Sequence, residues 1–528
     1  MLKESAQKIC ALTGAVLLAG DPSQEMRSFT NDTRAIKQGS TFVCFVGEKR
    51  DGNDFTISAI EAGAKGVVMC REARSSELMC AKSNGAVLLR AKDDNPFVFL
   101  QTLARAYRKR EGWLTVGVTG SVGKTTTRQM LKATLSARYK TFSNEGNFNS
   151  VIGVPLTILN APEGQEVFVC EMGMDHAGEI DTISSVALPN LGCITNIGTA
   201  HIGILGSQEN IARAKAEMVH WISPATSTCS SAVALSAAAH LTPVLFLDGN
   251  DDYLTFIAQT FAQKEGVSVE LLTTNNQGLS ASTNSCLQPY ARLQSIVLTQ
   301  NGTTRFTYLS HEGIAVEVAC PLLGEHMPLD ALFALAIAEY VGCEPHEAAK
   351  QIEGMRATSL RAEMKTLPGG ARFIDDSYNA NPASMMSALN LLESLPSFGN
   401  KIAVLGEMGE LGDKAKELHE QIGAYAGSKH FSTCIFVGGE NARSMYEAAK
   451  KEAVKKEDSK NEAVAKEDSK KEVGVRKTTA TEILFVANAE DARQALSSIL
   501  ESEQDIVLVK GSRFMALDAI AKEMNATC

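Results

Sequence analysis

The sequence contains no pair of cysteines in CxxC spacing and no Cys/His spacing typical of a zinc site, although it has 12 cysteines among 528 residues. This absence argues against a disulfide framework and a structural metal site, so we predict reduced, mostly buried thiols in a cytoplasmic protein. The chain also has no run of the about 20 apolar residues that a membrane-spanning helix requires. Thr13 and Gly14 interrupt the apolar stretch at residues 9–20, so we expect a first helix and strand there, not a signal peptide.

Positive charge is also scarce, because 51 Lys and Arg residues against 61 Asp and Glu residues give a formal net charge of -10. This balance argues against nucleic acid or an anionic membrane as the main partner. It does not argue against a phosphorylated small molecule, which a local basic or glycine-rich site can bind. At about 150 residues per domain the length suggests three or four domains, and a hydrophobic fraction of 44% is sufficient for their cores.

The patterning predicts an α/β protein with three domains, at residues 1–92, 93–356 and 357–528. Short apolar runs that alternate with helical segments are typical of mostly parallel sheets. We predict a small α/β N-terminal domain, a central mostly parallel sheet, and a C-terminal Rossmann-like, doubly wound sheet. The expected strands are residues 41–46 and 66–69; then 114–118, 167–171 and 191–196; then 372–376, 401–405, 434–437 and 506–509.

A low-complexity insertion interrupts the last domain at about residues 452–478. Residues 452–460 recur almost unchanged as residues 462–470, and both copies are rich in Lys and Glu. Such a segment is expected to be a solvated helix or disordered, with no chemistry of its own. The alternative is a partner-binding role.

The main chemical signal is the segment T-G-x-x-G-K-T-T at residues 119–126, between an expected strand and an expected helix. A glycine-rich turn there points backbone N–H groups at an anion, and the helix dipole adds to the attraction. Lys124 would reach the β- and γ-phosphates of a nucleotide, and the Thr125 hydroxyl would bind Mg²⁺. The strict Walker pattern requires a glycine where the chain has Val118, so this loop is a narrower variant.

Two polar residues follow further strands of the central domain. Glu171 ends one expected strand, and His201 follows another. Ligands of open α/β sheets bind beyond the carboxyl ends of the strands, so both residues are expected beside the phosphate loop, where they could hold a second divalent ion. Taken alone, a histidine such as His201 is more often packed than a ligand, and Lys215, in a helical segment, is expected to be a surface lysine.

With these residues in place, the sequence resembles the Mur ligase family over nearly its whole length. Within that family it is most similar to the branch that adds D-alanyl-D-alanine to UDP-N-acetylmuramoyl-tripeptide, and the string DDSYNANP is the most specific match. The motifs that carry the resemblance are NDTR at residues 31–34, FVGEKRDG at 45–52, GNFNSVIGVP at 146–155, DDSYNANP at 375–382, LGEMGELG at 405–412 and KGSR at 510–513.

The resemblance implies roles for individual residues. Lys215 matches a lysine that the family carbamylates with CO₂, and Lys124, Lys215, His201 and Glu171 would be catalytic. Two Mg²⁺ ions are implied, with the metal set Thr125, Glu171, His201 and Lys215. ATP would contact Gly120, Ser121, Val122, Gly123, Lys124, Thr125, Thr126, Asp330, Arg361 and Asp376. The substrate set is Asp32, Thr33, Arg34, Asn147, Asn149, Ser150, Tyr378, Asn379 and Asn381.

The implied reaction is an ATP-dependent amide ligation through an acyl phosphate, in peptidoglycan synthesis. The substrates would be UDP-MurNAc-tripeptide and D-Ala-D-Ala, and the resemblance implies a cytoplasmic monomer that binds no nucleic acid. The identity of the third residue of the tripeptide stays open. So does the group that deprotonates the incoming amine.

Two positions depart from the family pattern. Ser150 stands where a second Asn is usual, so a substrate contact there is lost or mediated by water. Asp330 stands where an Asn usually reads adenine, and an ionised Asp accepts hydrogen bonds but cannot donate them. We therefore expect altered nucleotide affinity with activity retained.

Three other functions are also compatible with a phosphate loop. A sister ligase or a folylpolyglutamate synthase would add a single amino acid, but DDSYNANP and the N-terminal motifs argue against both. An inactive nucleotide-binding homologue would not be expected to keep Lys124, Glu171, His201 and Lys215 together. A switch GTPase would need an N-K-x-D motif, which the sequence lacks.

Overall fold

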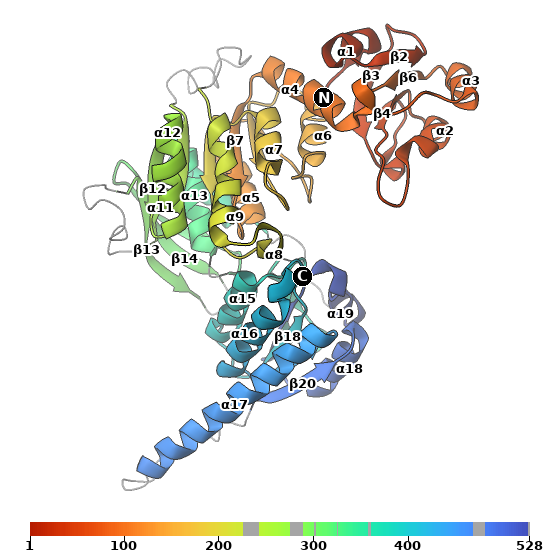
Figure 1. Cartoon of the computed structure of the whole chain (residues 1–528). Coiled ribbons are helices and arrows are strands. Elements are labelled where there is room, and N and C mark those ends of the chain that lie inside the picture. Colours follow the sequence, from red (N-terminus) through yellow and green to blue (C-terminus); the bar gives the residue numbers. More distant parts are fainter. Residues whose placement is uncertain are drawn as a thin grey trace.

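The computed structural model describes residues 1–224, 242–274, 289–299, 303–324, 326–356, 361–467 and 481–525. It contains three sheets, each formed by a separate part of the chain, and the predicted three-sheet α/β class is confirmed (Figure 1). The predicted domain boundaries stay a prediction. Among the described residues, no helix is long and apolar enough to cross a membrane.

The N-terminal sheet has six strands in the order β1-β3-β4-β5-β6-β2. Its middle strands are parallel, and the edge strands β1 and β2 are antiparallel to their neighbours. The expected strand at 41–46 is shorter, because the chain turns back where Gly52 N donates to Phe45 O (2.8 Å). The elements are β1 (Glu4–Ser5), α1 (Ala6–Thr13), β2 (Val16–Ala19), β3 (Glu25–Thr30), β4 (Ser40–Val43), α2 (Thr56–Glu61), β5 (Gly66–Met69), α3 (Ser75–Asn84) and β6 (Val87–Arg90).

The central sheet has nine strands in the order β15-β14-β13-β12-β11-β10-β7-β9-β8. The strands from β8 to β13 are parallel, and β13, β14 and β15 form an antiparallel end. The strands are β7 (Leu114–Thr119), β8 (Thr141–Ser143), β9 (Val167–Glu171), β10 (Leu191–Ile194), β11 (Val244–Asp248), β12 (Ser268–Thr273), β13 (Ala291–Leu298), β14 (Thr304–Leu309) and β15 (Ala315–Cys320).

Helices cover both faces of this central sheet, whose strands β7, β9 and β10 are entirely buried. Helices α5 and α13 pack together on one side, and Tyr139 fixes that side by donating its hydroxyl to Val341 O (2.6 Å). The helices are α4 (Pro96–Glu111), α5 (Lys124–Leu135), α6 (Gly153–Leu159), α7 (Glu179–Ala187), α8 (Ile202–Leu205), α9 (Gln208–Ala216), α11 (Asp252–Ile257), α12 (Gln263–Glu265), α13 (Met327–Tyr340) and α14 (Pro345–Glu353).

The C-terminal sheet has the order β16-β17-β21-β18-β19-β20 and is parallel except for β16. Residues 452–467 of the predicted insertion extend α17, which projects away from the molecule (Figure 1), and the rest lies outside the described residues. The elements are β16 (Glu363–Thr366), β17 (Arg372–Asp376), α15 (Pro382–Ser394), β18 (Lys401–Gly406), α16 (Ala415–Ser428), β19 (Thr433–Val437), α17 (Glu440–Glu467), β20 (Glu482–Val486), α18 (Ala489–Ile499), β21 (Ile506–Lys510) and α19 (Asp518–Glu523).

Candidate functional site

The predicted phosphate loop connects β7 to α5 and is held by side chains from the end of β10. The expected strand at 191–196 ends at Ile194, because Thr195 and Asn196 turn their side chains to the loop. Thr195 Oγ1 and Asn196 Nδ2 both donate to Val122 O (2.6 and 2.9 Å), and Asn196 Oδ1 accepts from Val122 N (3.0 Å). These three hydrogen bonds tie the loop to the end of β10.

The two glycines of the loop are required by its tight packing. Both have positive φ, 150° at Gly120 and 86° at Gly123, a region that L side chains rarely adopt. A Cβ on Gly120 would lie 1.9 Å from Thr195 Oγ1, and one on Gly123 would lie 2.5 Å from Asp330 Oδ1. The T-G-x-x-G pattern thus follows from backbone geometry and from two specific neighbours.

Lys124 lies at the N-terminus of α5 and folds back over the loop. Its Nζ donates to Gly120 O (2.8 Å) and Ser121 O (3.3 Å). Burial lowers the pKa of Lys124, and the negative charge of Glu171 acts in the opposite direction. An incoming phosphate would offer this ammonium better acceptors than two carbonyl groups.

Glu171 ends β9 beside the loop, as its position in the sequence predicts. Its Oε1 accepts from Thr125 Oγ1 (3.1 Å) and from Asn149 Nδ2 (2.9 Å). Its Oε2 lies 3.4 Å from Arg128 Nε, but neither atom has an aligned hydrogen bond within the described part of the chain. A buried carboxylate oxygen that lacks a hydrogen bond can still accept a ligand.

Lys215 is almost completely buried on α9, so the expectation of a surface lysine, taken without the family, is wrong. Its Nζ donates to Gly120 O (2.9 Å), the same carbonyl that Lys124 contacts from the other side. Burial lowers the pKa of Lys215 well below its usual value, and the charge of Lys124 lowers it further. Burial therefore favours the neutral amine of this side chain, which is the nucleophilic form.

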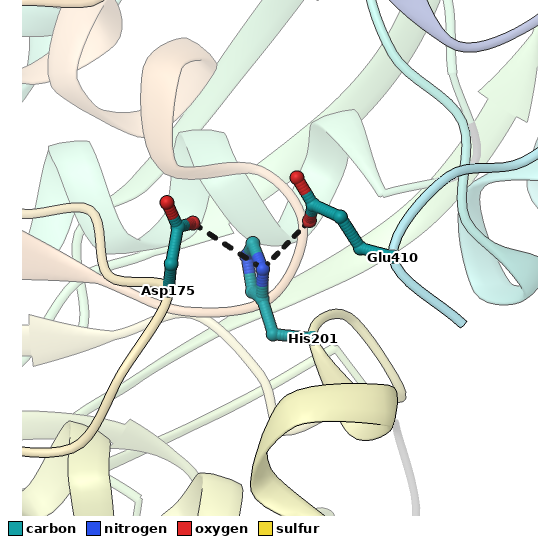
Figure 2. Close-up of side chains that lie close together, drawn as sticks. All are labelled: Asp175, His201 and Glu410. Atoms are coloured by element: carbon teal, nitrogen blue, oxygen red, sulfur yellow. Dashed lines mark ion pairs between the residues drawn. The ribbon is translucent and has the colours of Figure 1, made fainter. Parts of the chain in front are cut away.

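His201 precedes α8 with φ 62°, and its ring lies between two carboxylates (Figure 2). Its Nδ1 is 2.8 Å from Glu410 Oε2 and 3.4 Å from Asp175 Oδ1, although the ring is not aligned for a hydrogen bond. The three residues are close enough to hold one cation together. The His201 ring lowers the pKa of Glu410.

The C-terminal domain forms the opposite wall of a cavity of about 300 Å³ above the phosphate loop. The Arg361 guanidinium lies 4.2 Å from the centre of the Tyr378 ring. Asp376 accepts from Lys510 Nζ (2.7 Å) and from Ala362 N (3.1 Å). The predicted residues that line the cavity are Ser121, Val122, Gly123, Lys124, Thr125, Thr126, Asn149, Ser150, Glu171, His201, Arg361, Asp376, Tyr378, Asn379 and Asn381.

The structure does not bring every predicted residue to this cavity. Asp32, Thr33 and Arg34 lie on the N-terminal domain, where Asp32 pairs with Arg34 (2.7 Å) and caps the turn that follows it. Gly120, in the phosphate loop, and Lys215, behind it, do not line the cavity. Asn147 is exposed in the loop before α6, outside the lining of the cavity.

Asp330, expected near adenine, lies beneath the phosphate loop. Its Oδ1 accepts from Thr127 Oγ1 (2.9 Å), and its Oδ2 has no hydrogen-bond partner in the described ranges. Burial raises the pKa of this carboxyl well above its usual value. Burial therefore favours the neutral carboxyl, which can donate as well as accept.

Sequence reasoning missed several residues of the site. Asp175 and Glu410 flank His201, and Thr195 and Asn196 hold the phosphate loop. Asn196 is the last residue of a predicted strand, a signal that could have identified it. Glu410 belongs to a motif of the family resemblance, but nothing in the sequence indicates that it contacts His201.

Comparisons with known proteins agree with this arrangement. Residues 118–338 match the model of the Mur ligase middle domain, and residues 360–513 match that of the Mur ligase glutamate ligase domain. The chain is 32% identical over 99% of both chains to the UDP-N-acetylmuramoyl-tripeptide–D-alanyl-D-alanine ligase of Bacillus subtilis. In fold it resembles MurF from Acinetobacter baumannii (TM-score 0.79, 24% identity, 99% of both chains). It also resembles MurF ligase from Thermotoga maritima in complex with ADP (TM-score 0.71, 20% identity, 94% of this chain and 97% of that one).

Proposed function

This chain belongs to the Mur ligase family, and we propose that it is the ATP-dependent ligase that joins D-alanyl-D-alanine to UDP-N-acetylmuramoyl-tripeptide in peptidoglycan synthesis. The observation that carries the proposal is the cavity between the phosphate loop and the C-terminal domain, which gathers Lys124, Glu171, Arg361 and Asp376. The full-length relative that bears this activity in its name supports the choice of substrates.

ATP is bound with its phosphates on the loop between β7 and α5. The backbone N–H groups and the N-terminus of α5 attract the phosphates, and Lys124 exchanges its carbonyl contacts for the β- and γ-phosphate oxygens. Arg361 and Asp376 hold the nucleotide from the C-terminal domain. A ligase of similar fold, that of Thermotoga maritima, was solved in complex with ADP, which supports a nucleotide as the ligand.

The donor set in the cavity fits two Mg²⁺ ions. The Thr125 hydroxyl and the Glu171 carboxylate already contact each other (3.1 Å), and Glu171 Oε2 is free of hydrogen bonds to described residues. His201 lines the same cavity. Hydroxyl and carboxylate oxygens suit Mg²⁺, and the bound ions would neutralise charge on the transferring phosphate.

Lys215 contributes to the metal site as a carbamate. Burial lowers the pKa of its amine and favours the neutral form, which would attack CO₂, lose a proton and become an anionic carboxylate. The change replaces a costly buried ammonium by an anion that a cation can pair with. The contact of Lys215 with Gly120 O puts this group directly behind the phosphate loop.

The reaction proceeds in two steps. A carboxylate oxygen of the tripeptide attacks the γ-phosphorus, the bond to the β-phosphate oxygen breaks, and an acyl phosphate and ADP form. The amine of D-Ala-D-Ala then attacks the acyl carbon, the carbon–oxygen bond breaks, and phosphate leaves with that oxygen. Lys124 and Arg361 stabilise the redistributed phosphate charge, and the two walls of the cavity exclude water from the acyl phosphate.

The remaining assignments follow from the same family. Asp32, Thr33 and Arg34 hold the uridine diphosphate end of the substrate on the N-terminal domain, and Asn147, Asn149, Ser150, Tyr378, Asn379 and Asn381 line the path of its peptide. The protein acts as a monomer in the cytoplasm.

The test is phosphate release by the purified protein with ATP and Mg²⁺. Release should require both UDP-MurNAc-tripeptide and D-Ala-D-Ala, and single amino acids in place of the dipeptide should give none. Release with a single amino acid would favour a sister ligase, and release that depends on neither substrate would contradict ligation.

A further inference from the structure

One of the contacts between the central and C-terminal domains lies beside the proposed metal site. His201 belongs to the central domain, and Glu410 belongs to the loop between β18 and α16 of the C-terminal domain. Their side chains face each other with Nδ1 and Oε2 2.8 Å apart, while Asp175 of the central domain approaches the same nitrogen from the other side (3.4 Å, Figure 2).

The backbones on the two sides are shaped for this contact. His201 and Glu410 both have φ 62°, a conformation uncommon for residues with a Cβ. A Cβ on Gly203 would lie 2.5 Å from Gly412 N and 2.9 Å from Glu410 O. The turn that begins α8 therefore abuts the 410–412 backbone directly, and this close approach brings Glu410 to the imidazole.

The contact between Glu410 and His201 matters because of how histidine binds metal ions. An imidazole that binds a metal through one nitrogen usually donates the N–H of its other nitrogen to a carboxylate or a carbonyl, which fixes the tautomer and the ring orientation. Glu410 is adjacent to Nδ1, which leaves Nε2 for the cation. The χ2 torsion of histidine is broad, so the ring can change its orientation towards the carboxylate at little cost.

We propose that Glu410 is a positioning residue for His201, so that the C-terminal domain completes the second metal site of the central domain. The proposal rests on the metal site assigned above to His201, although not on the identity of the peptide substrates. Glu410 accepts the Nδ1 proton only while α8 and the 410–412 turn are in contact. Cation affinity and domain contact are thereby coupled.

The experiment is a titration of the full chain with Mn²⁺ in the presence of ADP, followed by electron paramagnetic resonance of the free ion. We expect two sites, of which His201→Ala removes the weaker one. Glu410→Ala should lower affinity at that site by about 10-fold or more, as loss of an outer partner does elsewhere. Glu410→Gln, whose amide oxygen still accepts the Nδ1 proton, should recover most of the affinity.

The matched control is Asp413→Ala, which removes the same charge from an exposed residue of the same loop. It should leave both Mn²⁺ sites unchanged. If Glu410→Ala behaves like this control, the positioning role is wrong while the proposed ligase activity stands. If Glu410→Gln loses as much affinity as Glu410→Ala, Glu410 is itself a ligand and the proposal is also overturned.

The coupling to domain contact is tested with Gly203→Ala, which keeps Glu410 but separates the two turns. We expect it to reduce Mn²⁺ affinity to the level of Glu410→Ala, and the double variant to lose nothing more, because both changes remove one interaction. Additive losses, or wild-type affinity in Gly203→Ala, would contradict the coupling. If His201→Ala leaves both Mn²⁺ sites intact, His201 is not a metal ligand. The proposed ligase activity is then tested independently by the phosphate-release assay.

Discussion

The two walls of the cavity are built in different ways. The central-domain wall is assembled within one sheet. Its Thr125 and Glu171 are buried and hydrogen-bonded to each other, and Lys215 is buried behind the phosphate loop, where it donates to Gly120 O. The C-terminal wall consists of side chains such as Arg361 and Asp376, and Glu410, which is 55% exposed, contacts His201 across a domain boundary. One wall is organised in advance, whereas the other is complete only when the domains meet.

This difference predicts different kinetic effects. Changes in the central wall should reduce the rate of the chemical step, because those groups stabilise charge as it moves. Changes in the C-terminal wall should mainly weaken the binding of nucleotide or cation, because those groups must first be brought into place.

The largest effect is expected for Lys124→Ala. Loss of the ammonium that faces the phosphates should lower kcat by about 100- to 1000-fold, as loss of one preorganised donor to a developing charge does elsewhere. Steady-state phosphate release measures this, with circular dichroism as the control for folding. If the variant keeps the wild-type kcat, Lys124 does not stabilise charge in the chemical step, and the role assigned to the central wall is wrong.

Lys215→Ala should cost nearly as much, about 100-fold in kcat, because it removes the proposed carbamate ligand. Added bicarbonate should not restore activity, since alanine has no amine to carbamylate. Mass spectrometry under native conditions should detect the carbamate on the wild-type chain and not on the variant. Full activity in Lys215→Ala would mean that the carbamate has no role.

Arg361→Ala should raise the ATP KM by about 10-fold, the equivalent of one hydrogen bond to a charged group, and change kcat little. Arg443→Ala is the matched control, because Arg443 also lies over an aromatic ring, that of Phe485 (4.4 Å), in the same domain but outside the cavity. If Arg361→Ala lowers kcat and leaves the ATP KM unchanged, the expectation that the C-terminal wall mainly affects binding is wrong.

The smallest effect is expected for Asp330→Asn, and it concerns stability. Burial in the folded state raises the pKa of this carboxyl well above 3.8 and so favours its neutral form. The unfolded chain ionises above that value, so the wild-type protein loses stability as pH rises towards the folded pKa, by about 1.4 kcal/mol per pH unit. Asparagine does not ionise, so the stability of Asp330→Asn should not fall with pH for this reason.

Thermal melting between pH 4 and pH 8 measures the effect. The Tm advantage of Asp330→Asn should grow with pH and then level off. An advantage that is the same at every pH would contradict a neutral buried carboxyl. An unchanged ATP KM in this variant would also remove the expected influence of Asp330 on nucleotide affinity.

Much of the central wall could be predicted from the sequence, because a strand end fixes where a side chain lies. Glu171 and the phosphate loop were placed in this way. Lys215 could not be placed without the family, since nothing in a helical pattern tells a buried lysine from an exposed one. Glu410 lies more than 200 residues from His201, and only the docking of two domains brings them together.

The most direct measurement of the central claim uses UDP-MurNAc-tripeptide labelled with ¹⁸O in its reacting carboxylate. Ligation through an acyl phosphate transfers one labelled oxygen to the phosphate released when D-Ala-D-Ala is added. We predict phosphate with one ¹⁸O atom and the pentapeptide product in equal amounts. Unlabelled phosphate, released while ATP is consumed, would contradict the account.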